Sequence, residues 1–315
     1  MSKNRNYLLD NIKAILIFFV VLGHYIEPFI NTSNGLKFLY VAIYSFHMPL
    51  FVFVSGSLLK LNKNKFKWGS IVVPLVISQI IFSLTGMLYS KVNPLFNLYW
   101  ILWFLLTLLF WNVITPHFIK IKHHFIIAIV LAIVAVFFEY TRPVSLFPFF
   151  LIGYHFKDSY LNILKKYKYL FLIVTGAIFV LIFMNIDIIN FKTFYYSLSY
   201  KTLGYSISIG LLVRIISYII SSIIGIALLT TMPNRKLCFS YIGENTLLVY
   251  LVHGIFAKYF AHIKLLQHTS IYIVLLLSIA TTLIFSIKIL NQGSKKFIKI
   301  IYDNKLIHSL QIKKS

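Results

Sequence analysis

The sequence has very little of the charge that a water-soluble protein carries on its surface. Among 315 residues, only 7 are Asp or Glu and charged residues make up 12%, whereas 59% are hydrophobic and 17% are aromatic. A soluble domain has roughly 25% charged residues, because polar side chains must cover its surface. The composition excludes a soluble enzyme, a coiled coil and a disordered chain, and it indicates a membrane protein.

Cysteine and other metal-binding patterns are also scarce. Cys238 is the only cysteine, which excludes an internal disulfide bond and a cysteine-based zinc site. We therefore expect no bound metal and no resident cofactor. The start of the chain resembles a signal peptide, but Asp10 and Lys13 interrupt its apolar run. We interpret it as an uncleaved first transmembrane segment.

Long apolar runs make up most of the chain. A helix needs about 20 mostly apolar residues to cross a bilayer. We predict an all-α fold, a polytopic bundle of about ten transmembrane helices in one domain over 1–292, followed by a basic cytoplasmic tail at 293–315. The predicted spans are 8–29, 37–59, 69–90, 97–116, 124–139, 143–156, 169–187, 204–230, 241–261 and 270–291. The aromatic and polar segment 190–201 either lies on the membrane interface or crosses it.

The net charge of +23 has two interpretations. In a soluble chain it would suggest nucleic-acid binding, whereas in a membrane protein it records orientation, because cytoplasmic loops collect Lys and Arg. With a cytoplasmic N-terminus, the predicted map puts 21 of the 30 cations in cytoplasmic segments and 7 in outer ones. This asymmetry favours orientation over nucleic-acid binding. It places both termini in the cytoplasm and the protein in a plasma membrane, which we expect to be bacterial.

Four ionisable residues lie within the first predicted span. At about 100° per residue, Asp10, Lys13, His24 and Glu27 share an arc of roughly 100° on one helix face. A charged group in the bilayer costs at least about 2.5–3.5 kcal/mol, so this face must contact protein or a wet cavity. The alternative for Asp10 and Lys13 is that they extend to the inner headgroups.

Further polar residues are predicted at the depth of His24. His47 and His253 fall in the same middle-to-outer band, and Tyr250 precedes His253 by three positions on one helix face. Pro49 and Gly56 loosen the second span, which membranes tolerate beside polar neighbours. His47 or His253 taken singly is as consistent with a structural hydrogen bond as with a site, but the three histidines together predict a site.

Arg214 is a further costly residue, near the middle of the eighth predicted span. It either pairs with a carboxylate such as Glu27 or Glu244, or holds a phosphate or carboxylate ligand. Lys13 and His24 are eleven residues apart, or about 16 Å along one face. That separation suits a phosphate-bearing cytosolic donor with a long arm, such as acyl-CoA. His24 would then act as general base or nucleophile.

Several motifs resemble the acyltransferase 3 family of integral membrane O-acyltransferases, in its fucose 4-O-acetylase-like branch. The first is the basic residue Lys13, ten intervening positions and His24. The others are Phe46-His47-Met48-Pro49-Leu50-Phe51 with Ser55-Gly56, Leu102-Trp103-Phe104-Leu105, Arg142 with Phe147-Pro148-Phe149-Phe150-Leu151-Ile152-Gly153-Tyr154, and Ile242-Gly243 with Asn245-Thr246 and Tyr250-Leu251-Val252-His253. Lys13 stands where Arg is frequent in the family, and Glu244 where Lys is frequent. No extracytoplasmic hydrolase-like domain follows.

This resemblance implies transfer of an acyl group, chiefly acetyl, from cytosolic acyl-CoA to a hydroxyl of a cell-surface or lipid-linked glycan. It implies that His24 is the base or a transient acyl carrier, and that Lys13 with Asp10 lies near the donor. Glu27, His47, Arg142, Arg214, Tyr250 and His253 would form the chamber or contact the acceptor, although Arg142 suits a plain interfacial role equally well. Expected partners are acyl-CoA, the glycan, membrane lipid and cell-envelope biosynthesis proteins.

Two other functions fit the same residues less well. A transporter or flippase for glycans or polyprenyl-linked sugars would also use buried cations, histidines and broken helices. No convincing inverted repeat is present in the sequence, which argues against it. A structural subunit of an envelope assembly would not need aligned ionisable groups within its first span.

Overall fold

The computed structural model describes residues 5–61, 69–89, 98–262 and 271–303. Within these ranges the protein is helical throughout and contains no strand, as predicted. The first half consists of α1 (Tyr7–Ile26), η1 (Glu27–Phe29), α2 (Asn34–Tyr44), α3 (His47–Leu61), α4 (Gly69–Tyr89), α5 (Trp103–Phe118), α6 (His124–Val134), η3 (Ala135–Phe137), α7 (Arg142–Ser145) and α8 (Phe147–His155). The second half consists of α9 (Asp158–Lys166), α10 (Lys168–Met184), η4 (Phe191–Tyr195), α11 (Ile207–Thr231), α12 (Ser240–Glu244), α13 (Thr246–His262), α14 (Ile271–Phe285) and α15 (Lys288–Asp303).

Several predicted spans are interrupted. Among the described residues, three helical stretches are long and apolar enough to cross a membrane, namely 7–29, 34–61 and 207–231. The pairs α9–α10 and α14–α15 pass the same test but are bent by 73° and 59°, and four further apolar helices are shorter. The ten crossings and the cytoplasmic side of the termini therefore stay predictions. So does the tail at 293–315, since its boundary falls inside α15 and 304–315 lie outside the described residues.

Four spans predicted as single helices are divided in the structure. Span 37–59 breaks between α2 and α3, 143–156 consists of the short α7 and α8, 241–261 divides into α12 and α13, and α14 ends before 291. The helix breaks between α2 and α3, just before Pro49, and polar side chains contact the backbone carbonyls at this break. The Ser221 hydroxyl donates to the Ser45 carbonyl, and His47 Nδ1 lies 2.8 Å from the Ile43 carbonyl oxygen. Freed carbonyls can remain in a membrane protein when such partners are present.

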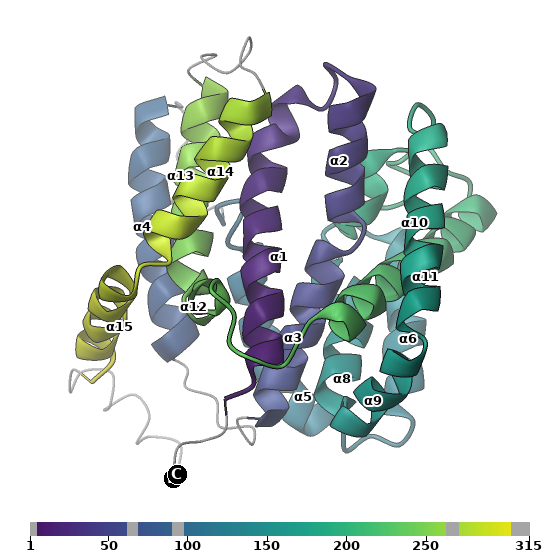
Figure 1. The fold of residues 1–315 in the computed structure, drawn as a ribbon, viewed down its shortest axis with the longest axis horizontal. Helices are drawn as coiled ribbons and strands as arrows, with labels where there is room; N and C mark the ends of the chain where they lie inside the picture. The colour runs from purple at the N-terminus through teal and green to yellow at the C-terminus, as the bar shows by residue number, and fades with distance from the viewer. Residues whose placement is uncertain (1–4, 62–68, 90–97, 263–270, 304–315) are drawn as a thin grey trace.

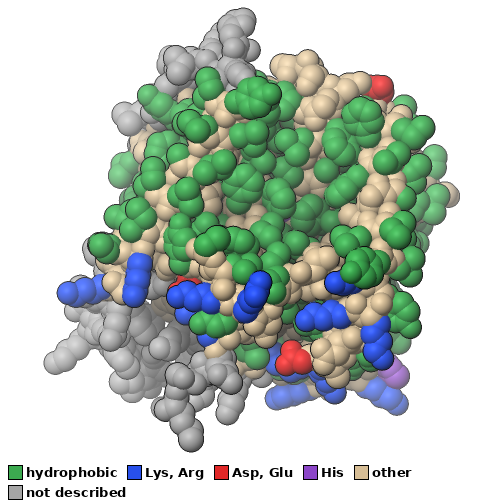
Figure 2. Space-filling model, viewed as in Figure 1, with side chains coloured by type: hydrophobic (Ala, Val, Ile, Leu, Met, Phe, Trp, Pro, Cys, Tyr) green, Lys and Arg blue, Asp and Glu red, His purple; other side chains and the backbone are tan. Residues whose placement is uncertain are grey.

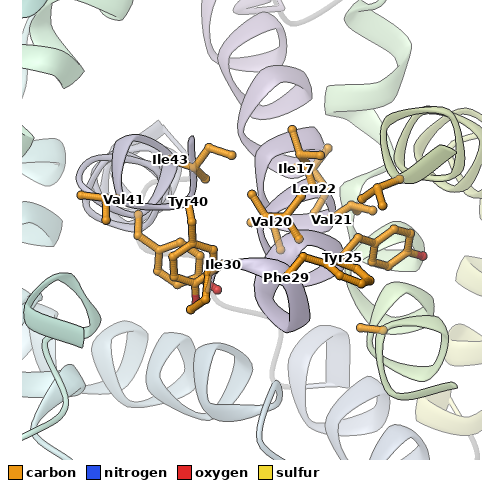
Figure 3. Packing of buried hydrophobic residues seen from close by; sticks show 14 of the residues in the cluster. Ile17, Val20, Val21, Leu22, Tyr25, Phe29, Ile30, Tyr40, Val41 and Ile43 are labelled. Carbon is orange, nitrogen blue, oxygen red and sulfur yellow. The ribbon is translucent and has the colours of Figure 1, made fainter. Parts of the chain in front are cut away.

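Helix α1 runs through the middle of the bundle, beside α2, α3, α12, α13 and α14 (Figure 1). It begins at Asn6, whose side chain accepts a hydrogen bond from the Leu9 amide and so caps the first turn. Figure 3 shows Val20 of α1 packed near Tyr40 of α2 within one buried apolar cluster. On its other side, the Tyr25 hydroxyl lies 3.0 Å from the Thr281 hydroxyl of α14. The central position of α1 means that its polar face cannot point to lipid.

Glycines let the helices around α1 approach very closely. A β-carbon at Gly243 of α12 would overlap the Asp10 carbonyl of α1. Gly56 of α3 and Gly153 of α8 face each other's helix in the same way, since β-carbons there would overlap the Phe150 and Phe53 carbonyls. Small residues allow such close packing between helices in a membrane. These contacts hold α12 against the start of α1, and α8 against α3.

The outer surface is that of a membrane protein. Large apolar side chains are exposed over the faces of several helices, for example Ile173, Met184 and Leu276 at 71%, 73% and 67%. Figure 2 shows this apolar face with Lys and Arg side chains gathered along one end. The chain begins α1 at that same end, and α15, which follows α14, lies toward it (Figure 1). This arrangement fits the predicted orientation, although some of the lysines counted in that prediction lie outside the described residues.

Candidate active site

A cavity of about 190 Å³ lies beside the C-terminal half of α1. Six of the residues predicted for the site line it, namely His24, Glu27, His47, Arg142, Tyr250 and His253. They come from α1, η1, α3, α13 and α7, so the interrupted helices meet here. Tyr44, Trp100, Trp103, Phe104 and Tyr195 supply aromatic walls. The structure therefore brings together most of the predicted site residues in one polar and aromatic chamber.

His24 is held by two polar neighbours. Its Nδ1 lies 3.2 Å from Glu27 Oε2 and 3.3 Å from the Tyr44 hydroxyl. A carboxylate only accepts hydrogen bonds, so the contact with Glu27 favours a proton on Nδ1 and leaves the lone pair on Nε2. The Trp100 ring packs against the imidazole with centroids 4.6 Å apart. In this tautomer Nε2 of His24 is able to accept a proton.

The other two histidines approach His24 differently. The His253 ring stacks on that of His24 with centroids 5.4 Å apart, and His253 is fully buried. Its Nδ1 lies 3.3 Å from the Val249 carbonyl, whereas Nε2 has no partner among the described residues. His47 lines the chamber, but its Nδ1 is occupied by the α2 carbonyl of Ile43. No group of three or more His, Cys, Asp or Glu in the described ranges is arranged to hold a metal ion.

Arg142 links the chamber to the segment between α10 and α11. Its Nε donates to the Tyr195 carbonyl at 2.9 Å, and its guanidinium lies 4.6 Å from the centroid of Trp103. The Tyr195 hydroxyl in turn contacts Glu27 at 3.4 Å and Tyr40 at 2.6 Å. A plain interfacial arginine would not be fixed on the chamber wall in this way. Arg142 and Tyr195 instead place a cation and a hydroxyl around the opening beside His24.

Lys13 lies in an ion-pair cluster at the other end of α1. Its Nζ is 2.9 Å from Asp10 Oδ1, and Arg5 Nε is 2.6 Å from Asp10 Oδ2. Arg5 also approaches Glu244 of α12 at 3.3 Å. The Lys13 and Asp10 side chains are only 14% and 8% exposed, so they do not extend to the headgroups. The cluster pairs two cations with two carboxylates, so its formal charges balance, and Lys13 and Asp10 are largely buried within it.

Lys13 lines a second cavity of about 220 Å³, which lies between α1, α3, α4, α5 and α13. Its lining is mainly apolar and includes the hydroxyl-bearing residues Ser55, Ser70 and Thr246. Val20, Met48, Phe104 and Tyr250 line both this cavity and the His24 chamber. We call these four residues the shared wall. The two cavities are thus neighbours on either side of one thin layer of side chains.

Arg214 does not join the chamber. It is 1% exposed and lies 5.2 Å from the ring centroids of Tyr196 and Tyr200 and 5.8 Å from that of Tyr218. In the described part of the chain no carboxylate lies within ion-pair distance of Arg214. Glu27 pairs with His24, and Glu244 pairs with Arg5. Of the two alternatives predicted for Arg214, the pairing with Glu27 or Glu244 is therefore not found among the described residues. Arg214 is instead enclosed by aromatic rings, an arrangement that stabilises a buried guanidinium by cation–π attraction.

Sequence reasoning missed several chamber residues. Tyr44 precedes His47 by three positions, a spacing that could have signalled it. Trp103 belongs to a motif that the sequence analysis quoted without a role. Tyr195 lies in the aromatic segment expected at the interface, and nothing in its spacing indicates that it reaches Glu27.

Comparison with known proteins gives two matches. A family model described as an acyltransferase domain matches residues 6–289. The nodulation protein NolL of Sinorhizobium fredii is 48% identical over 60 residues, which are 18% of this chain and 16% of that protein. The aligned part thus spans less than a fifth of NolL. No solved structure matches the chain.

Proposed function

Because the chain belongs to the acyltransferase 3 family and is an acyl-transferring enzyme, we propose that it moves an acetyl group from cytosolic acyl-CoA to a glycan hydroxyl. The acceptor is a cell-surface or lipid-linked sugar, and the enzyme acts in the bacterial plasma membrane. The motifs favour the fucose 4-O-acetylase-like branch. The observation that carries this proposal is that the Lys13 cavity and the His24 chamber meet at the shared wall.

The donor occupies the Lys13 cavity in this proposal. Lys13 is a point charge that attracts a phosphate group, and Asp10 fixes its direction. The apolar lining accepts the pantetheine arm, and the hydroxyls of Ser55 and Thr246 offer hydrogen bonds to its amides. About 16 Å separates Lys13 from His24 along α1. The thioester then reaches the shared wall while the nucleotide end stays near the cytoplasmic surface.

Transfer takes place in the His24 chamber. His24 Nε2 accepts the proton of the acceptor hydroxyl as its oxygen forms a bond to the thioester carbonyl carbon. The carbon–sulfur bond then breaks, and the proton passes to the leaving thiolate to give CoA and the ester. Glu27 stabilises the imidazolium through Nδ1. An acyl-histidine formed at Nε2 would reach the same products in two steps.

The acceptor approaches from the opposite end of the chamber. Trp100, Trp103 and Tyr195 provide flat aromatic surfaces that suit the apolar faces of a sugar ring. Arg142 and Glu27 offer charged hydrogen-bonding groups to the sugar hydroxyls beside them. A small number of placed polar groups among aromatic walls is the usual composition of a small-molecule site. Membrane lipid and cell-envelope biosynthesis proteins are the proposed surroundings of the enzyme.

Replacing Lys13 with alanine tests the donor site. We expect the KM for acetyl-CoA to rise by about tenfold to a hundredfold, since a hydrogen bond to a charged group contributes about 1.5–3 kcal/mol. The kcat at saturating donor should change much less, because Lys13 does not contact the reacting atoms. Initial rates of labelled ester formation in membranes, with acetyl-CoA varied, measure both constants.

Two controls accompany this measurement. Lys13→Arg keeps the charge and should retain most donor affinity. Lys166→Ala removes an exposed lysine of α9 and should leave both constants unchanged. An unaltered KM in Lys13→Ala would contradict the proposed donor site.

A further inference from the structure

The shared wall between the two cavities is a point that every transferred group must cross. It consists of Val20 from α1, Met48 from α3, Phe104 from α5 and Tyr250 from α13. The Lys13 cavity and the His24 chamber are about 220 and 190 Å³. For comparison, a cavity of about 150 Å³ holds one benzene molecule. The four side chains that line both spaces are therefore the narrow point between them, where the width open to an acyl group is set.

Three members of the shared wall are held in place. The Tyr250 hydroxyl donates to the Ile101 carbonyl. Phe104 packs between Phe51 and Tyr250, with ring centroids 5.5 and 5.9 Å away. Val20 is 5% exposed and has a branched, stiff side chain on α1. These side chains form the fixed part of the wall.

Met48 differs from the other three. It is half-buried, its side chain is unbranched, and it has three rotatable bonds, so it can move aside at low cost. Its neighbour His47 is anchored to the Ile43 carbonyl, which keeps the backbone of this turn in place. Motion of the Met48 side chain therefore changes the width of the wall without moving the helices.

We propose that Met48 and its three partners in the shared wall select the transferred acyl group by length, admitting acetyl and rejecting longer chains. This inference rests on the proposed function, because it assigns the donor to the Lys13 cavity. The acyl group is the leading end of the donor and crosses the wall first. Its tail must then share the chamber with the acceptor, so that each added methylene meets the wall or the sugar.

A competition experiment tests this selection. Membranes containing the full-length protein receive equal amounts of acetyl-CoA and hexanoyl-CoA, and mass spectrometry measures the ratio of the two esters formed on endogenous glycans. We expect the wild type to form acetyl esters at least tenfold more than hexanoyl esters. Met48→Ala should shift this ratio by at least tenfold toward hexanoyl, because it removes the movable part of the wall.

A second variant and a control keep the test decisive. Val20→Ala widens the same wall from α1 and should shift the ratio in the same direction if Met48→Ala is poorly produced. Met184→Ala makes the same change at an exposed position of α10 and should leave the ratio at the wild-type value. Unchanged ratios in both wall variants, with acetyl transfer intact, would overturn length selection but not the proposed function. Transfer from neither donor in the wild type would overturn both.

Discussion

Replacing His24 with alanine lowers acyl transfer at least about a hundredfold, within the range of roughly 10²–10⁴ expected for loss of a general base. The reason is that, of the three chamber imidazoles, His24 has a carboxylate partner, Glu27, to stabilise the imidazolium. His47 and His253 contact backbone carbonyls through Nδ1 instead. Labelled transfer from acetyl-CoA, normalised to the amount of protein in the membrane, measures the loss.

The neighbours of His24 supply the controls for this experiment. His117→Ala removes an exposed histidine of α5, far from the chamber, and should retain full activity. Glu27→Gln keeps an acceptor for Nδ1 but removes the charge that stabilises the imidazolium. It should reduce kcat roughly tenfold, equivalent to about 1.4 kcal/mol, with little change in the KM for acetyl-CoA. Full transfer by His24→Ala would show that His24 is not the base.

Replacing Gly153 with alanine destabilises the protein, although Gly153 does not contact the chamber. The added β-carbon would overlap the Phe53 carbonyl of α3, and backbone cannot move aside as a flexible side chain can. Helices α3 and α8 would have to separate. Overpacking typically costs about 1–3 kcal/mol, and a clash between two backbones lies at the upper end of that range. The expected result is a lower unfolding temperature in detergent and less folded protein.

Gly176 of α10 provides the matched control. A β-carbon there meets no atom within 4 Å, so Gly176→Ala should leave the protein equally stable or slightly more stable. Gly56→Ala, on the opposite side of the α3–α8 contact, should behave like Gly153→Ala. Thermal unfolding of the three purified variants would decide. Equal melting temperatures for Gly153→Ala and Gly176→Ala would contradict the close α3–α8 packing.

Periodicity along the first span was enough to predict its local contacts. Asp10 with Lys13, and His24 with Glu27, are three apart, and each pair meets in the structure. His24, His47 and His253, which were predicted at one depth, line one chamber in the structure. A helix of known pitch fixes such relationships before any tertiary contact is known.

Contacts made by broken or irregular segments could not be predicted in the same way. The chain leaves the helix at Ser45–Phe46 and at Asn245, where apolar composition still favours a continuous span. Those breaks are stabilised by distant groups such as Ser221, which sequence spacing does not reveal. Tyr196 and Tyr200, which contact Arg214, lie in an irregular segment before α11. Because such a segment has no periodicity, the sequence could not predict that aromatic rings enclose Arg214.

The central claim is that the protein transfers an acyl group to a glycan hydroxyl through His24. Mass spectrometry of surface and lipid-linked glycans tests it most directly, in wild-type cells, cells lacking the protein, and cells producing the His24→Ala form at equal level. The account predicts that one glycan carries an acetyl ester in the wild type, and that this ester is missing from the other two strains. An identical set of glycan esters in all three strains would contradict the account.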